Sequence, residues 1–228
     1  MKKVMGIVSG GMDSITMLHH LKAKGHEVCA ISFDYGQRHS KELEFAKNAC
    51  VELGIQWELC DLKSLTPLLS RSALTNPDID VPHGHYAAES MKATVVPNRN
   101  MIMLSIATGY AITNKCEAVA YAAHFGDHAI YPDCRVEFAD ALNEAIKLCD
   151  WQQIELVRPF VGIDKTAIAR IGDELGVDYS KTWSCKRVWS NFSSSQFLIA
   201  PSEPKSSTKP FSVLSLDRNQ NLKLRLYP

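Results

Sequence analysis

Short apolar runs alternate with segments of helically spaced apolar residues along the first 60 positions of the chain. Residues 3–8, 27–33 and 56–61 are apolar runs of strand length, and residues 13–24 and 40–53 between them have helical periodicity. Gly25 and Gly54 follow the two helical segments, as glycine commonly does where a helix ends. This order predicts strand–helix–strand–helix–strand, with right-handed crossovers and a mainly parallel sheet.

The periodicity is weaker between residues 62 and 96, where Pro, Asp, Asn and His are frequent. A weakly periodic segment of this length is typically a functional lid or a mobile insertion. Periodicity then returns and predicts helices at residues 100–112, 135–148 and 165–175, with strands at 118–122 and 154–157. The predicted fold class is α/β, with an open, mostly parallel sheet that has helices on both faces.

Residues 186–228 differ in composition from the rest of the chain. They contain seven Lys and Arg against two acidic residues and are rich in Ser and Pro, although the whole chain has 25 basic and 25 acidic side chains. Such a composition without sustained periodicity predicts an irregular, weakly ordered tail. The alternation in VLSL and LKLRL leaves room for one or two edge strands. We therefore expect a main domain at residues 1–185 and an atypical tail at 186–228.

The global composition excludes several classes of protein. The balanced charge gives no overall field for nucleic acid or an anionic membrane, and no apolar run approaches the roughly 20 residues of a membrane span. Glycines interrupt the short apolar run of the N-terminal stretch, and no cleavage site follows it. The seven cysteines form no C-x-x-C pair, which indicates reduced thiols. We expect a cytoplasmic protein with no membrane partner.

The first strand-to-helix turn reads SGGMDS, residues 9–14. Glycines allow backbone amides to approach a ligand, and the start of the following helix adds unpaired N–H donors, so the turn predicts a phosphate site. Asp13 has two candidate roles, capping the helix or holding a metal that accompanies phosphate. A tight Gly-Gly turn with nothing bound is the alternative. The turn matches neither the Walker A loop nor the G-x-G-x-x-G fingerprint.

Three other polar stretches follow predicted strands or begin a predicted helix: FDYGQRH (33–39), VPNRN (96–100) and YPDCR (131–135). Each alone has a structural explanation, as a solvated loop, a helix start or a capped turn. The carboxyl ends of parallel strands share one edge of a sheet, so together these stretches favour a common ligand site with the SGGMDS turn.

The SGGMDS turn resembles the pyrophosphate loop of the PP-loop ATP pyrophosphatases. With FDYGQRH, VPNRN, YPDCR and a later IDKTAIARIGDELGVDYSKTWSC, the chain resembles the 7-cyano-7-deazaguanine synthase family of the queuosine and archaeosine pathways over about residues 1–185. Two departures are VPNRN in place of the commoner VPGRN, and His128-Ala129-Ile130 where the family has a Ser-Gly pair before Tyr-Pro-Asp. The resemblance implies an adenine-nucleotide α-hydrolase-like, Rossmann-like fold.

The resemblance also implies an activity. The enzyme would be an ATP-dependent carbon–nitrogen ligase that converts 7-carboxy-7-deazaguanine and ammonia to the nitrile 7-cyano-7-deazaguanine (preQ0). Adenylation of the carboxylate, displacement of AMP by ammonia and a second ATP-driven activation of the amide would give the nitrile. ATP and Mg²⁺ would be required, nucleic acid would not be bound directly, and the family assembly is a homodimer.

The expected site residues fall into three sets. The catalytic candidates are Asp13, Arg99 and Lys165. The ATP-binding candidates are Val8, Ser9, Gly10, Gly11, Met12, Asp13, Ser14, Ile15, Thr16, Met17 and Leu18. The substrate-binding candidates are Tyr35, Gln37, Arg38, Asp127, Tyr131, Asp133 and Arg135.

A zinc site is also implied by the resemblance, because the family carries four cysteines near its C-terminus. Here Cys185 is the only remaining ligand, and no cysteine follows it. One thiolate cannot complete the tetrahedral site of a structural zinc ion, so we interpret Cys185 as a free thiol.

Two other functions remain open from the sequence. The same ATP site could serve another substrate, such as a tRNA base, although the main domain has no basic excess and no C-x-x-C motif. The chain could also be a catalytically impaired nucleotide-binding remnant, damaged by the loss of the zinc segment.

We hypothesise that the reading frame, or the evolutionary origin, of the chain changes near Lys186, where composition and family pattern change together. Translation of the other two frames of the gene beyond codon 185 should then reveal a continuation rich in C-x-x-C. If neither frame contains one, the frameshift hypothesis is wrong.

Overall fold

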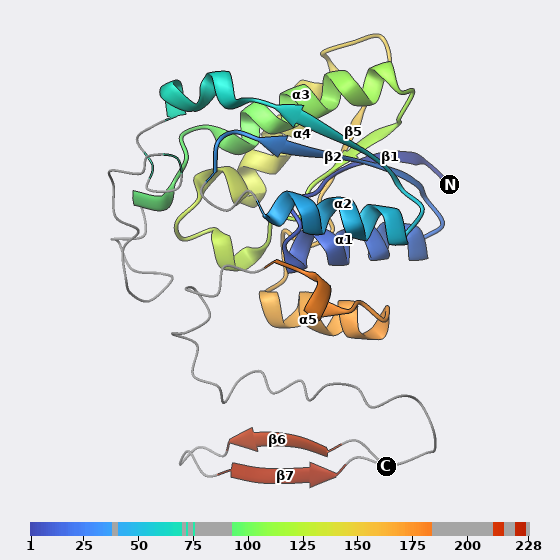
Figure 1. Cartoon of the computed structure of the whole chain (residues 1–228), viewed down its shortest axis with the longest axis vertical. Coiled ribbons are helices and arrows are strands. Elements are labelled where there is room, and N and C mark those ends of the chain that lie inside the picture. The colour runs from blue at the N-terminus through green and yellow to red at the C-terminus, as the bar shows by residue number, and fades with distance from the viewer. Residues whose placement is uncertain are drawn as a thin grey trace. The chain divides into compact units, whose positions relative to one another are not determined.

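The computed structural model describes residues 1–37, 41–69, 72, 75 and 93–183, and the backbone of residues 212–216 and 222–226 (Figure 1). The chain divides into two compact units, Met1–Asn191 and Phe192–Pro228. The sequence-based boundary at residues 185 and 186 lies among residues that are not described.

In the described part of the first unit, five parallel strands form one sheet in the order β3–β2–β1–β4–β5. The strands are β1 (Lys3–Ile7), β2 (Glu27–Asp34), β3 (Gln56–Asp61), β4 (Ala118–Ala120) and β5 (Glu155–Val157). The order reverses at β1, because β2 lies on one side of it and β4, which comes much later in the chain, lies on the other. The predicted open α/β sheet is confirmed.

Helices cover both faces of this sheet, as Figure 1 shows. The helices are α1 (Met12–Ala23), α2 (Glu42–Glu52), α3 (Arg99–Thr113), α4 (Val136–Lys147) and α5 (Lys165–Glu174). Alternate side chains of β1 enter different cores: Met5 packs on the α3 and α4 side, whereas Val4 packs on the α1 and α5 side. Strands buried on both faces explain the continuous apolar runs in the sequence.

The predicted elements differ from the observed ones by at most two residues at either end. Such differences are expected, because periodicity locates the buried face of an element and not its terminal hydrogen bonds. Short 3-10 helices were not predicted; the longest of those described is η1 (Lys63–Leu69), which contains Pro67. Most of the predicted lid at residues 62–96 lies outside the described residues.

The second unit contains an antiparallel pair, β6 (Ser212–Leu216) and β7 (Leu222–Leu226). These are the two segments whose alternating pattern left room for strands. The predicted irregular remainder of the tail lies outside the described residues.

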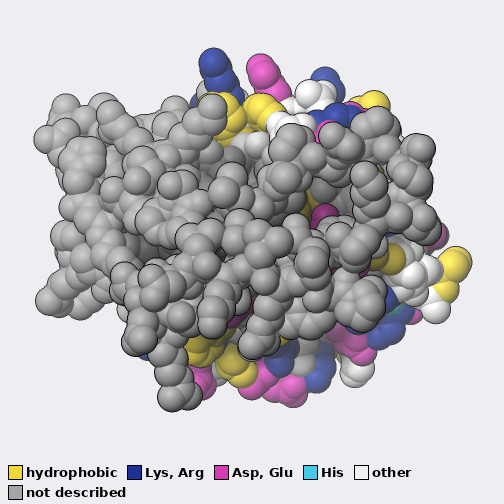
Figure 2. Space-filling model, turned by 90° about the horizontal axis from the view of Figure 1, so that it is seen from below, with side chains coloured by type: hydrophobic (Ala, Val, Ile, Leu, Met, Phe, Trp, Pro, Cys, Tyr) yellow, Lys and Arg dark blue, Asp and Glu magenta, His cyan; other side chains and the backbone are white. Residues whose placement is uncertain are grey.

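Across the part of the chain that the structure describes, no helix is both long and apolar enough to span a membrane. On the side of the molecule shown in Figure 2, the described Lys and Arg side chains are interspersed with Asp and Glu side chains.

The turn between β1 and α1 depends on a glycine. Gly10 has φ +87°, and a Cβ atom added to it would lie 2.0 Å from the backbone oxygen of Glu42. Gly25 has a similar φ of +77°, but a Cβ atom added to Gly25 would have no neighbour within 4 Å. The two glycines therefore share the same backbone conformation and differ only in crowding.

Gly10→Ala should destabilise the protein much more than Gly25→Ala. The left-handed conformation alone costs an alanine about 1 kcal/mol, which is the loss expected for Gly25→Ala. Gly10→Ala must also displace the backbone of α2, so we expect a loss of about 3 kcal/mol or more. Urea unfolding of both variants measures the difference; equal losses would show that the contact with Glu42 imposes no constraint.

Candidate functional site

The loops that follow β1 and β4 meet at the carboxyl edge of the sheet. β1 and β4 are hydrogen-bonded neighbours, with Val4 opposite Ala118 and Gly6 opposite Ala120. The chain leaves these two strands toward different helices, and such a switch point is where open α/β sheets bind ligands. The expected ligand position therefore lies between the loop at residues 8–11, which follows β1, and the loop at residues 121–135, which follows β4.

The loop before α1 presents backbone donors at this edge. The N-cap of α1 is Gly11, which provides no side-chain cap, so the first N–H groups of the helix have no acceptor within it. Ser14 Oγ donates to the Gly11 carbonyl at 3.0 Å, and Ser9 Oγ accepts from the Gly11 amide at 3.4 Å. These bonds hold the loop in the conformation that suits an anion.

Asp13 does not cap α1, which excludes one of its two predicted roles. It lies inside the first turn, because the helix already begins at Met12. Its Oδ2 atom is 3.3 Å from Nζ of Lys165, the first residue of α5. Its Oδ1 atom is buried and has no hydrogen-bond partner among the described residues. A buried carboxylate oxygen without a partner fits a metal ligand better than a helix cap.

A histidine from the loop after β4 joins this group. His124 Nε2 lies 3.8 Å from Asp13 Oδ2 and 3.5 Å from Oδ2 of Asp127, which ends the short helix η3 (Phe125–Asp127). Asp13, His124, Asp127 and Lys165 therefore form one cluster, which we call the Asp13 cluster.

The segment before Cys185 contacts the same loop. The backbone amide of Trp183 donates to the Gly10 carbonyl at 2.8 Å, and its ring lies 5.5 Å from that of Phe45 in α2. Trp183 of the family pattern is thus anchored directly on the SGGMDS loop and on α2.

Arg99 lies at the centre of a second group, the Arg99 cluster, with Tyr35, Tyr131 and Asp133. Burial lowers the pKa of the Arg99 guanidinium, but Tyr35, Asp133 and Tyr131 outweigh it and the pKa lies above its ordinary value. Arg99 is therefore a permanent cation. Burial raises the pKa of Tyr131, whose hydroxyl is 2.8 Å from Thr94 Oγ1. This cluster unites the FDYGQRH, VPNRN and YPDCR stretches.

Asp133 holds the start of α3 in place. Its Oδ2 atom accepts from the Asn100 amide at 3.0 Å, and its backbone oxygen accepts from Asn100 Nδ2 at 3.2 Å. The N-cap of α3 is Asn98, with φ 56°. Asparagine tolerates this left-handed conformation better than most residues. The change from VPGRN to VPNRN therefore preserves the backbone geometry of the motif.

Gln37 and Glu42 connect the FDYGQRH turn to α2. Gln37 Oε1 accepts from the Tyr35 amide at 2.9 Å, and Gln37 Nε2 donates to the Phe33 carbonyl and to Glu42 Oε1, each at 3.2 Å. Burial raises the pKa of Glu42 to about 7, although Gln37 and Arg99 oppose the shift. The side chain of Gln37 is thus fully engaged in shaping the turn.

The remaining predicted residues have varied positions. The side chains of Val8, Ile15, Met17 and Leu18 lie in the core, which leaves residues 9–14 as the polar part of the predicted ATP stretch. Thr16 is also buried, 3.2 Å from the Tyr179 hydroxyl. Arg135 Nε donates to the His128 carbonyl at 2.8 Å. Arg38 and Cys185 are outside the residues that the structure describes, so the roles predicted for them stay predictions.

Sequence reasoning missed His124 and Glu42 as members of the site. Glu42 follows FDYGQRH by three residues and His124 precedes YPDCR by seven, but a single histidine or glutamate there has no spacing that distinguishes it from a structural residue. Their significance comes from burial and from partners distant in the sequence.

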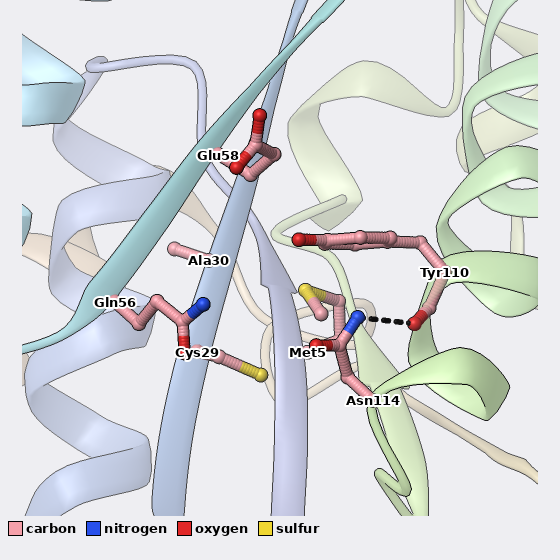
Figure 3. Close-up of a pocket in the computed structure, with 7 residues that line it drawn as sticks. All are labelled: Met5, Cys29, Ala30, Gln56, Glu58, Tyr110 and Asn114. Carbon is pink, nitrogen blue, oxygen red and sulfur yellow. Dashed lines mark hydrogen bonds between the residues drawn. The ribbon is translucent and has the colours of Figure 1, made fainter.

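A shallow depression beside α3 lies away from both clusters. Met5, Cys29 and Ala30 of the sheet, Gln56 and Glu58 of β3, and Tyr110 and Asn114 at the end of α3 surround it (Figure 3). It is too narrow to admit a substrate. Beneath it, the buried Cys29 Sγ contacts Cys116 Sγ at 3.3 Å, and both cysteines are free thiols, in agreement with the prediction of reduced cysteines.

The family resemblance implies Mg²⁺ and Zn²⁺, and the residues of this chain suit Mg²⁺ but not Zn²⁺. Asp13 Oδ1 fits a Mg²⁺ ligand, because oxygen atoms are what Mg²⁺ prefers. No group of three or more His, Cys, Asp or Glu that could hold a metal ion occurs within the described ranges. A four-thiolate zinc site does not fit this chain, because Cys185 is the last cysteine of its sequence.

Glu42 should make stability fall as pH rises. Its pKa of about 7 exceeds the ordinary value of 4.5, so between these pH values the folded chain holds a proton that the unfolded chain has lost. The free energy of unfolding should therefore decrease over this range, by up to about 3 kcal/mol from this group.

Glu42→Gln removes the titration and keeps an acceptor for Gln37. The variant should match the parent protein near pH 4 and exceed its stability at pH 8. Urea unfolding at both pH values measures this; parallel losses of stability in the two proteins would contradict the assignment.

Comparisons with known proteins agree with this architecture. A sequence model of the family described as queuosine biosynthesis protein QueC matches residues 3–191. The 7-cyano-7-deazaguanine synthase 1 of Colwellia psychrerythraea is 53% identical over 184 residues, which are 81% of this chain and 84% of that protein. The 7-cyano-7-deazaguanine synthase of Caldicellulosiruptor saccharolyticus is 54% identical over 179 residues, covering 78% and 79% of the two chains.

Solved structures share the fold. The U34-tRNA thiolase NcsA from Methanococcus maripaludis superposes with a TM-score of 0.52 at 18% identity, over 81% of this chain and 60% of its own. A 4-thiouridine synthetase in complex with RNA and bound ATP gives 0.52 at 15% identity, over 79% of this chain and 42% of its own. At these identities the likeness shows the fold alone.

The match of the family model and the close relatives confirm the resemblance inferred from the four motifs. This chain belongs to the family of the queuosine biosynthesis protein QueC.

Proposed function

We propose that this chain is an ATP-dependent carbon–nitrogen ligase that converts 7-carboxy-7-deazaguanine and ammonia to 7-cyano-7-deazaguanine. One observation carries the proposal: the sequence motifs lie together at the carboxyl edge of the sheet. They do so in a chain that is 53% and 54% identical to two 7-cyano-7-deazaguanine synthases. Tyr35, Arg99, Tyr131 and Asp133 come from three separate stretches and form one cluster. The SGGMDS loop lies at the same edge of the sheet.

The SGGMDS loop binds the phosphates of ATP in this proposal. The unpaired N–H groups at the start of α1 donate to phosphate oxygens, and Lys165 supplies a positive charge beside Asp13. Asp13 would hold Mg²⁺, which offsets negative charge on the phosphates.

The Arg99 cluster binds the deazaguanine. The permanent cation of Arg99 suits a carboxylate, and neighbouring tyrosines and Asp133 keep the guanidinium charged despite its burial. An aspartate is suited to the N–H edge of a guanine-like base, and Asp133 and Asp127 are the candidates in the YPDCR region. Holding the carboxylate beside the nucleotide would let its oxygen attack the α-phosphate and displace pyrophosphate, and the resulting acyl-adenylate has AMP as a good leaving group.

Ammonia as co-substrate, the homodimer and a cytoplasmic location belong to the same proposal. So does the division of the chain into a synthase domain at residues 1–185 and an atypical tail. Zinc is not part of it, because the chain lacks three of the four thiolates that the family site needs.

The test is incubation of the chain with 7-carboxy-7-deazaguanine, ATP, Mg²⁺ and ammonium, followed by mass analysis for the nitrile. We expect the nitrile together with AMP. Release of AMP without nitrile would contradict the substrate, and the absence of any ATP turnover would contradict the enzyme itself.

Lys165→Met should lower kcat by about 100-fold, as is usual when one preorganised electrostatic group is lost. Lys181→Met is the matched control, because Lys181 pairs with Glu52 at the surface at 2.8 Å. It should retain the activity of the parent protein. Equal activity of the two variants would exclude Lys165 from the chemistry.

A further inference from the structure

His124 is a buried imidazole between two carboxylates of different motifs. Its side chain is 5% exposed, whereas those of Asp13 and Asp127 are 22% and 18% exposed. Asp13 belongs to the SGGMDS loop and helix α1, and Asp127 belongs to the segment that leads into YPDCR. The imidazole is thus a link between the loop that binds nucleotide and the segment that binds the deazaguanine in the proposed function.

The proton of this imidazole can be placed from its two neighbours, whose carboxylates lie at ion-pair distance. Nε2 faces two carboxylate oxygens, so it must be the donor, because a bare nitrogen would face only acceptors. In the neutral ring, Nδ1 is then unprotonated. This agrees with its position, where it is buried and has no hydrogen-bond partner among the described residues.

The Nε2–H group reduces the electrostatic repulsion between the carboxylates of Asp13 and Asp127. Two carboxylates that are largely shielded from water repel each other more strongly than they would in bulk solvent. Lys165 balances Asp13 from the side of α5. On the side that faces Asp127, His124 is a donor within reach of both carboxylates.

The ring has little freedom to move. A Cβ atom added to Gly126 would lie 3.0 Å from Cε1 and 3.1 Å from Nδ1 of His124. The backbone at Gly126 therefore packs directly against the imidazole and holds its Nε2 edge toward the carboxylates.

We propose that His124 is a positioning residue of the synthase, whose Nε2–H fixes the carboxylates of Asp13 and Asp127 relative to each other. The nucleotide loop and the deazaguanine segment are thereby held in register. This inference rests on the proposed function for its catalytic consequence, but its effect on the nucleotide loop does not depend on the identity of the second substrate.

Three substitutions of His124 distinguish the effect of losing the N–H donor from the effect of losing the volume of the ring. The amide nitrogen of glutamine can reach the position of Nε2, whereas that of asparagine reaches only the position of Nδ1, and leucine has no donor. We expect H124N and H124L to bind MgATP about tenfold more weakly than the parent protein, because both lose the electrostatic attraction of the Nε2–H group for the two carboxylates. H124Q should stay within about threefold of it. Isothermal titration calorimetry measures each affinity, and thermal unfolding checks that each variant folds.

A double variant tests the repulsion between the carboxylates. If His124 offsets the charge of Asp127 at Asp13, removing that charge should compensate for the lost donor. H124L/D127N should bind MgATP within about threefold of D127N alone. An equal affinity of H124Q and H124N, or a double variant as weak as H124L, would overturn the proposal.

Gly126→Ala displaces the ring without removing it. Its methyl group must push the imidazole by a few tenths of an ångström. We expect MgATP binding weaker by about threefold, which is smaller than the loss in H124L. Gly162→Ala is the matched control, because a Cβ atom added to Gly162 would have no neighbour within 4 Å. Unchanged binding in both glycine variants would contradict the constraint on the ring.

Nitrile formation by the same variants gives the second readout. The turnover number should follow the order of the parent protein, H124Q, then H124N and H124L. If the parent protein binds ATP but makes no nitrile, the proposed function is wrong, while the order of ATP affinities still decides the role of His124. If it makes nitrile and the affinities do not differ, the inference about His124 is wrong and the proposed function stands.

Discussion

The backbone of Gly10 lies against the backbone of Glu42, and the geometry of the site depends on this contact. A side chain at position 10 would lie 2.0 Å from the Glu42 carbonyl oxygen, so α2 can pack this closely only on a glycine. Because α2 begins at Glu42, the contact also fixes the FDYGQRH turn, through the bond between Gln37 and Glu42. The SGGMDS loop and residues 33–37 of the second motif are therefore linked through the start of α2.

Charge within the site is balanced by pairs from different elements. The carboxylates of Asp13 and Asp127 face a lysine and an imidazole, and the guanidinium of Arg99 faces tyrosines and an aspartate. Each charged group is thus offset before any ligand arrives, which limits the cost of burying it. A ligand that carries phosphate and carboxylate groups would meet an arrangement of donors that needs little reorganisation.

The sequence predicted the sheet, the helices and the edge at which the motifs meet, because these follow from periodicity and from the parallel direction of the strands. It could not predict the role of His124, since the partners of this residue are separated from it by three positions in one case and by more than a hundred in the other. Nor could it decide between the two roles of Asp13, which depended on whether α1 begins at residue 12 or 14. The raised pKa of Glu42 comes from burial at the start of a helix, which is not encoded in any local pattern.

The bond from the Trp183 amide to the Gly10 carbonyl has a consequence for the history of the chain. It ties the end of the described part of the first unit to the nucleotide loop. Any residue other than proline at position 183 could donate this bond, whereas the contact of the Trp183 ring with Phe45 depends on the tryptophan. The change of composition near Lys186 begins three residues after Trp183, so it leaves both contacts of Trp183 in place.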